Sequence, residues 1–120
     1  MSQSPFTSVE HLPTAIVVHV LASTLRKTEV DGVCAGVDEA RLTAPELPFV
    51  LDMAKVSFMG SLAIGVLVGL NKEFTNRNQR LIFAGLQPQL YDAIKVTHLH
   101  KVLDIQPDVA AALRSVASAD

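Results

Sequence analysis

Ser61 is the side chain whose type and position best suit it to chemistry. It follows a short polar loop and precedes the apolar stretch Leu62–Leu70, a pattern that predicts the start of a helix. The first N–H groups of a helix have no partners within it and carry a partial positive charge, so they tolerate a phosphate. A serine at this point also suits a simple helix cap. The pattern therefore leaves two roles open for Ser61, a phosphorylation site and an N-cap.

The neighbours of Ser61 decide what a phosphate would change. Phe58, Met59 and Leu62 are apolar, and a partner that contacts them also contacts Ser61. A phosphate adds about −1.5 to −2 charges, and burying such an unpaired charge costs several kcal/mol. Since ~1.4 kcal/mol is a factor of ten in affinity, phosphorylation would switch off docking without unfolding the domain.

The remaining polar residues give little support for catalysis. Asp52 ends an apolar strand beside the Ser61 loop, where its carboxylate either contacts a partner or orients the loop. His98 and His100 are too few for a metal site, which needs about three or four ligands. The sequence contains no Gly-rich phosphate loop and no supported Ser-His-Asp arrangement. We therefore expect no enzyme, no cofactor and no metal.

Composition narrows the class of protein further. The formal net charge is −2, and Lys and Arg are scattered along the chain, whereas nucleic-acid or membrane-surface binding requires clustered cations. The longest apolar run is about half of the ~20 residues that span a bilayer. Cys34 is the only cysteine, and the first residues do not resemble a signal peptide. These features predict a soluble cytoplasmic protein that binds neither nucleic acid nor membrane.

The order of strand and helix patterns predicts an α/β fold. We expect strands at 6–12, 15–21, 49–53, 80–84 and 102–105, and helices at 25–41, 61–75, 88–96 and 107–116. Ser23 or Thr24 would cap the first helix. Gly65 and Gly69 are expected to let the second helix pack closely on the sheet. Strands that alternate with helices indicate parallel crossovers.

One segment resembles a known family, STAS, named for sulphate transporters and anti-sigma-factor antagonists. Bacterial antagonists typically have apolar-apolar-Asp-apolar at a strand, then Phe-Met-Asp-Ser-Ser-Gly-Leu-Gly at the following loop and helix start. The matching residues here are Val50-Leu51-Asp52-Met53, Phe58, Met59, Ser61, Ile64 and Gly65. The stretch Arg80–Pro88 is similar to the family's next strand and its Gly-Leu-Ser-Pro turn. The resemblance is best over residues 45–115.

The resemblance implies a fold and a mode of action. It implies a single STAS domain over residues 1–120, with residues 1–5 as a disordered end. The sheet would be mixed, with four to five strands and about four helices packed mainly on one side. The domain would dock an anti-sigma factor that is also a serine kinase, and phosphorylation of Ser61 would release it. The implied docking residues are Asp52, Phe58, Met59, Gly60, Leu62 and Gly65, with Met59, Leu62 and Gly65 at the centre.

Gly60 departs from the family pattern, which has aspartate at this position beside the serine. The departure favours an alternative function, a STAS scaffold subunit of a larger signalling or transport complex that is never phosphorylated. A third hypothesis is a domain that binds a small apolar molecule or a nucleotide between helix and sheet. Formation of a homodimer through the apolar face is a further alternative.

Overall fold

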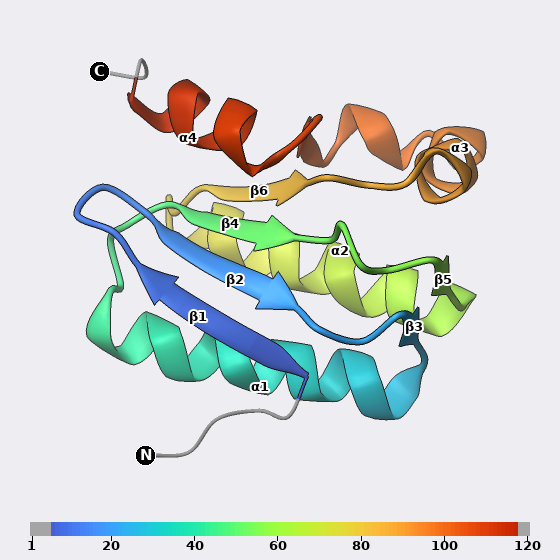
Figure 1. Cartoon of the computed structure of the whole chain (residues 1–120), viewed down its shortest axis with the longest axis horizontal. Helices are drawn as coiled ribbons and strands as arrows, with labels where there is room; N and C mark the ends of the chain where they lie inside the picture. Colours follow the sequence, from blue (N-terminus) through green and yellow to red (C-terminus); the bar gives the residue numbers. More distant parts are fainter. Residues whose placement is uncertain (1–5, 118–120) are drawn as a thin grey trace.

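The computed structural model describes residues 6–117 and shows a five-stranded mixed sheet (Figure 1). The expected disordered segment, residues 1–5, lies outside the described residues. The strands, in their order across the sheet, are β1 (Thr7–His11), β2 (Ile16–Val20), β4 (Phe49–Asp52), β6 (Leu81–Ala84) and β7 (Asp104–Gln106). Only β1 runs antiparallel to its neighbour, and the remaining pairs are parallel.

Helices cover both faces of this sheet. They are α1 (Lys27–Thr43), α2 (Ser61–Asn76), α3 (Pro88–Val96) and α4 (Val109–Ala117), with a short 3₁₀ turn, η1 (Leu99–Lys101). Figure 1 shows α1 and α2 along one face and α4 on the other. The buried Leu90 and Ile94 of α3 join the same core as α1 and α2. The predicted mixed sheet of four to five strands, with about four helices packed mainly on one side, is confirmed for the described residues.

Successive side chains along the central strands point alternately into two apolar cores, one on each face of the sheet. In β4, Phe49 and Leu51 are buried in the larger cluster with α1 and α2, whereas Val50 is buried in the smaller cluster under α4. A strand covered on both faces needs apolar residues at every position. This explains the continuous apolar runs that predicted the core strands.

The chain departs from the sequence prediction before each of the first two helices. Two short strands, β3 (Thr24–Leu25) and β5 (Phe58–Met59), pair in parallel as a separate two-stranded sheet. Because Leu25 belongs to β3, α1 begins later than predicted and its N-cap is Arg26 rather than Ser23 or Thr24. The backbone N–H of Arg26 donates to Glu29 Oε1 (3.0 Å). Between residues 6 and 117, no helix combines the length and apolarity needed to cross a bilayer.

A row of ionisable side chains joins three strands at the α4 face. Protonated His19 of β2 donates from Nδ1 to Asp52 of β4 (2.7 Å) and from Nε2 to Glu10 of β1 (3.1 Å). Burial lowers the pKa of His19, but the hydrogen bonds and charges of Asp52 and Glu10 outweigh it, so the pKa lies above 6.5. Asp52 Oδ1 also accepts the N–H of Ala54 (3.1 Å). Asp52 thus orients the loop after β4, which is one of the two roles that the sequence left open for this carboxylate.

The aromatic pair between β4 and α2 generates a prediction about stability. Phe74 is fully buried, its ring lies 5.3 Å from that of Phe49, and the Arg41 guanidinium stacks over it at 3.9 Å. We expect Phe74→Ala to lower the free energy of unfolding by about 3–5 kcal/mol, because the cavity loses packing on both sides. Urea denaturation measures this. Leu42→Ala, at a side chain that is 83% exposed, is the control and should change the free energy of unfolding little. A loss of stability in Phe74→Ala no larger than that in Leu42→Ala would contradict the packing.

The His19 cluster generates a prediction about pH. A raised folded pKa stabilises the fold fully below the unfolded value of 6.5, and this contribution is lost as pH rises through the folded pKa. Unfolding free energies measured across this window should fall with rising pH, and Asp52→Asn should flatten that slope. Asp31→Asn, which removes the partner of exposed Lys27, should leave the slope intact. An unchanged slope in Asp52→Asn would show that the cluster has no such role.

Candidate docking site at the start of α2

Two loops meet where α2 begins, at the end of the molecule on the right of Figure 1. In the β3–β5 pair, Thr24 lies opposite Phe58 and Leu25 opposite Met59. The N–H of Gly60 donates to Leu25 O (3.1 Å), which extends the pairing to the helix cap. The β4–α2 loop is therefore fixed to the β2–α1 loop by backbone bonds rather than left free.

The β6–α3 segment supports the same loop from a second side. Gln87 Nε2 donates to Ala54 O (3.0 Å), and Gln89 Nε2 donates to Ser57 O (3.4 Å). Ser57 N–H in turn donates to Ser23 O (2.8 Å). The residues before α2 are thus held by two other connections, the one between β2 and α1 and the one between β6 and α3.

Side chains alternate between surface and core along this segment. Phe58 is 50% exposed and Leu62 is 57% exposed, as expected for docking residues. Met59 lies between them in sequence but is only 7% exposed, and it packs in the main core. The expectation that Met59 lies at the centre of a docking face is therefore wrong: adjacent residues of a strand point to opposite sides, and in β5 Phe58 points outward and Met59 inward.

Ser61 is the first residue of α2 and is exposed. The N-cap is Gly60, so Ser61 does not have the capping role that the sequence left open. Within residues 6–117, its hydroxyl forms no hydrogen bond. The exposed hydroxyl is accordingly available to a modifying enzyme and contributes no cap to the fold.

Small residues leave the outer side of α2 flat. Gly65 is exposed, and a Cβ added there, or at exposed Gly69, would have no atom within 4 Å. These glycines therefore do not bring α2 close to the sheet, which corrects the sequence interpretation. Since positions three and four apart share a helix face, Ser61, Leu62 and Gly65 form one continuous strip. A partner backbone could approach this strip closely.

Gly60 is not required by the backbone conformation. Its φ of −72° and ψ of 163° suit any residue, and a Cβ placed there meets nothing within 4 Å. The space that an aspartate would occupy at this position is open.

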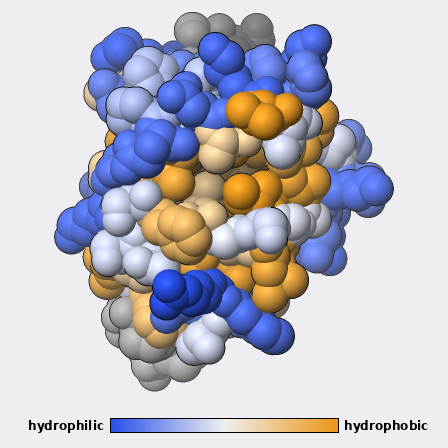
Figure 2. Space-filling view, turned by 90° about the vertical axis from the view of Figure 1, so that its right-hand side faces the viewer, coloured by the Kyte–Doolittle hydropathy of each residue, from blue (hydrophilic) through white to orange (hydrophobic). Residues whose placement is uncertain are grey.

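The surface around Ser61 combines apolar and cationic groups. Leu21, after β2, is 42% exposed at the same end of the sheet, and the Arg26 guanidinium lies 6.0 Å from the centre of the Phe58 ring. Figure 2 shows apolar surface gathered across the middle of this end, between polar margins. We name the exposed set Leu21, Phe58, Ser61, Leu62 and Gly65 the docking patch. Leu21 and Arg26 were missed because a residue after a strand carries no exposure signal in sequence.

The remaining candidates do not supply a catalytic group to this end. Burial, with the nearby charges of Asp38, Asp31 and Glu73, raises the pKa of Cys34 to about 11, so the thiol is not activated. His98 is exposed at the end of α3, and His100 packs edge-on to Tyr91. In the part of the chain that the structure describes, no group of three or more His, Cys, Asp or Glu side chains is arranged to hold a metal ion.

Comparison with known proteins agrees with this geometry. A family model of the STAS domain matches residues 7–112. The anti-sigma-B factor antagonist of Listeria monocytogenes is 32% identical over 56 residues, which cover 47% of this chain and 49% of that protein. The chain thus spans about half the length of the curated relatives it matches.

Solved structures share the whole fold. A STAS domain protein from Planctomyces limnophilus, described as an anti-sigma-factor antagonist, is 25% identical with a TM-score of 0.81, covering 93% of this chain and 98% of that one. The antagonist SpoIIAA has been solved unphosphorylated, at 18% identity and TM-score 0.70 over 93% of this chain and 98% of its own. The phosphorylated Bacillus form has 17% identity and a TM-score of 0.66 over 91% and 98%. The match of the family model over most of the sequence shows that this chain belongs to the STAS domain family.

Proposed function

We propose that the protein is an antagonist of an anti-sigma factor, which it binds through the docking patch and from which phosphorylation of Ser61 releases it. The observation that carries the proposal is an exposed, non-capping hydroxyl at the start of α2, flanked by exposed Phe58 and Leu62. The curated relatives named anti-sigma-B factor antagonists support the general role. The phosphorylated form of SpoIIAA supports modification of this fold.

Because the loop before α2 is fixed, a change of charge at Ser61 is sufficient to release the partner without a change of conformation. A partner that covers Phe58 and Leu62 also removes water from Ser61, which lies between them in sequence. A phosphate at the first turn of α2 is compatible with the folded domain, because its oxygens face unpaired N–H groups. In the complex the same phosphate must lose its hydration, at a cost of several kcal/mol if unpaired. The modified protein therefore keeps its fold and loses its partner.

The absence of the family's aspartate at Gly60 bears on the kinase. An aspartate there would place a negative charge beside the serine, and its absence leaves Arg26 as the charged neighbour of Phe58. We infer that the kinase that acts on this chain does not need the acidic residue. The open space at Gly60 allows this inference to be tested with a side chain that the fold tolerates.

Phosphorylation by the cognate anti-sigma factor kinase tests the switch. With ATP, the protein should gain one phosphate at Ser61, detected by intact mass and peptide mapping, and Ser61→Ala should gain none. Ser57→Ala is the matched control, because Ser57 is also exposed in this segment but its Oγ donates to Ser23 O (3.1 Å). Gly60→Asp should be modified at least as fast as the wild type. Equal incorporation in Ser61→Ala would refute the assignment.

Substitution of Leu62 tests the docking patch. Leu62→Asp should weaken binding of the unphosphorylated protein to the anti-sigma factor by roughly tenfold or more, because an unpaired carboxylate would be buried in the contact. Leu42→Asp makes the same change at an exposed leucine near the end of α1 and should bind normally by calorimetry.

The two results together separate the switch from the scaffold alternative. Loss of binding in Leu62→Asp but not in Ser61→Asp would indicate a permanent contact through the same patch. Normal binding by Leu62→Asp would place the contact elsewhere on the domain.

A further inference from the structure

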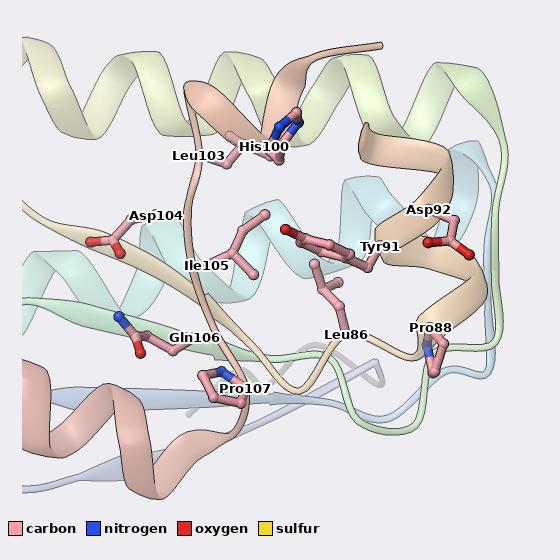
Figure 3. Close-up of a pocket in the computed structure, with 10 residues that line it drawn as sticks. All are labelled: Leu86, Pro88, Tyr91, Asp92, His100, Leu103, Asp104, Ile105, Gln106 and Pro107. Carbon is pink, nitrogen blue, oxygen red and sulfur yellow. The ribbon is translucent and has the colours of Figure 1, made fainter. Parts of the chain in front are cut away.

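The cavity between α3 and β7 shows how cations are engaged elsewhere in the domain. It has a volume of about 670 Å³, and Asp104 lies across β7 from its apolar wall at Tyr91 and Ile105 (Figure 3). Asp104 accepts a hydrogen bond from Arg80 Nε (2.8 Å). The Nζ of Lys95 lies 5.8 Å from the centre of the Tyr91 ring. Arg80 and Lys95 therefore have partners within the chain.

The Arg26 guanidinium, beside the docking patch, is not neutralised in this way. The carboxylate of Glu29 accepts the backbone N–H of Arg26 (3.0 Å). The carboxylate of Asp31 pairs with Lys27 (2.7 Å). The guanidinium itself lies 6.0 Å from the centre of the Phe58 ring, and a cation–π contact at an exposed site is weak. Among the side chains that the structure describes, it thus has no carboxylate partner.

The backbone register brings Arg26 beside the start of α2. Leu25 lies opposite Met59, and the N–H of Gly60 donates to Leu25 O (3.1 Å). The same register places Arg26 opposite Gly60, about 4.8 Å away across the pair, and Ser61 is the next residue. Arg26 and Ser61 are both exposed. A long arginine side chain spans this separation, so its guanidinium can reach a group attached to the Ser61 hydroxyl.

We propose that Arg26 binds the phosphate of phosphorylated Ser61. The proposal rests on the proposed function, which supplies the phosphate. The guanidinium fork matches two phosphate oxygens, and such a charge-assisted pair is stronger than the contact with the Phe58 ring.

The pair reverses the charge beside the docking patch. A phosphate carries about −1.5 to −2 charges, so the single positive charge of Arg26 is replaced by a net charge of about −0.5 to −1. A partner surface that suits the cation of the unmodified protein therefore meets a negative charge in the modified one. This remaining charge still has to lose its hydration in a complex, which is consistent with release of the partner.

Phosphoserine incorporated at position 61 during translation tests the pairing without a kinase or a partner. The ³¹P chemical shift of the full chain, followed against pH, gives the second pKa of the phosphate, which is about 6 without a neighbouring charge. A guanidinium nearby favours the dianion and lowers this pKa. We expect Arg26→Gln to raise it by at least ~0.5, a roughly threefold tighter binding of the proton. Equal pKa values in the two chains would overturn the proposal.

Variants of neighbouring cations are the controls. Lys27→Gln and Lys55→Gln remove exposed positive charges near Arg26 and in the β4–α2 loop, and each should shift the phosphate pKa less than Arg26→Gln does. Arg26→Lys keeps the charge without the fork and should give an intermediate pKa, which keeps the test informative if Arg26→Gln is less stable. A larger shift in either lysine variant than in Arg26→Gln would contradict the assignment to Arg26.

The test separates this inference from the proposed function. If the cognate kinase does not modify Ser61, the proposed function fails, whereas the incorporated phosphoserine still reports on Arg26. If the kinase modifies Ser61 and the partner is released, but Arg26→Gln leaves the phosphate pKa unchanged, only the role of Arg26 is refuted.

Discussion

Burial of the Met59 side chain is the interaction on which the candidate site depends. Met59 lies in the core beside Met53, Leu67 and Phe83, and its backbone pairs with Leu25. With this side chain inserted, the pleat of a strand turns Phe58 to the solvent, and α2 begins two residues later at Ser61. The same residue thus fixes the loop to the fold and determines which of its neighbours a partner can reach.

The larger architecture could be predicted from sequence because its signals are local. Apolar runs such as Phe49–Met53 and the proline at position 88 identify core strands and a helix start, and α3 begins at Pro88 as expected. The β3–β5 pairing could not be predicted, because it joins two-residue segments that are far apart in the chain and lack a strand pattern. That pairing is the reason why Met59 is buried and why Arg26, not Ser23 or Thr24, caps α1. The sequence predicted correctly that α2 begins at Ser61. It left open whether Ser61 caps the helix, because that depends on whether the first helical residue is 61 or 62.

The arrangement suits regulation by charge rather than by shape. Hydrogen bonds of Gly60, of Ser57 and of the two glutamines after β6 fix the loop before α2. Phosphorylation of Ser61 is therefore expected to move this loop little. In the sheet below it, β6 is apolar and buried at every position and β4 at every position except its last, Asp52, and such close packing keeps the surface above it rigid. A partner then responds to the change in hydration at one point of an otherwise constant surface.

Hydrogen exchange of the unphosphorylated protein, measured alone and with its anti-sigma factor, tests the central claim most directly. If the start of α2 is the docking site, peptides that cover residues 57–66 should gain protection in the complex, together with the 21–26 loop paired to them. Peptides at the opposite end, around residues 42–48, should exchange as they do in the free protein. Protection confined to that opposite end or to the β1 edge, with residues 57–66 unchanged, would contradict the account.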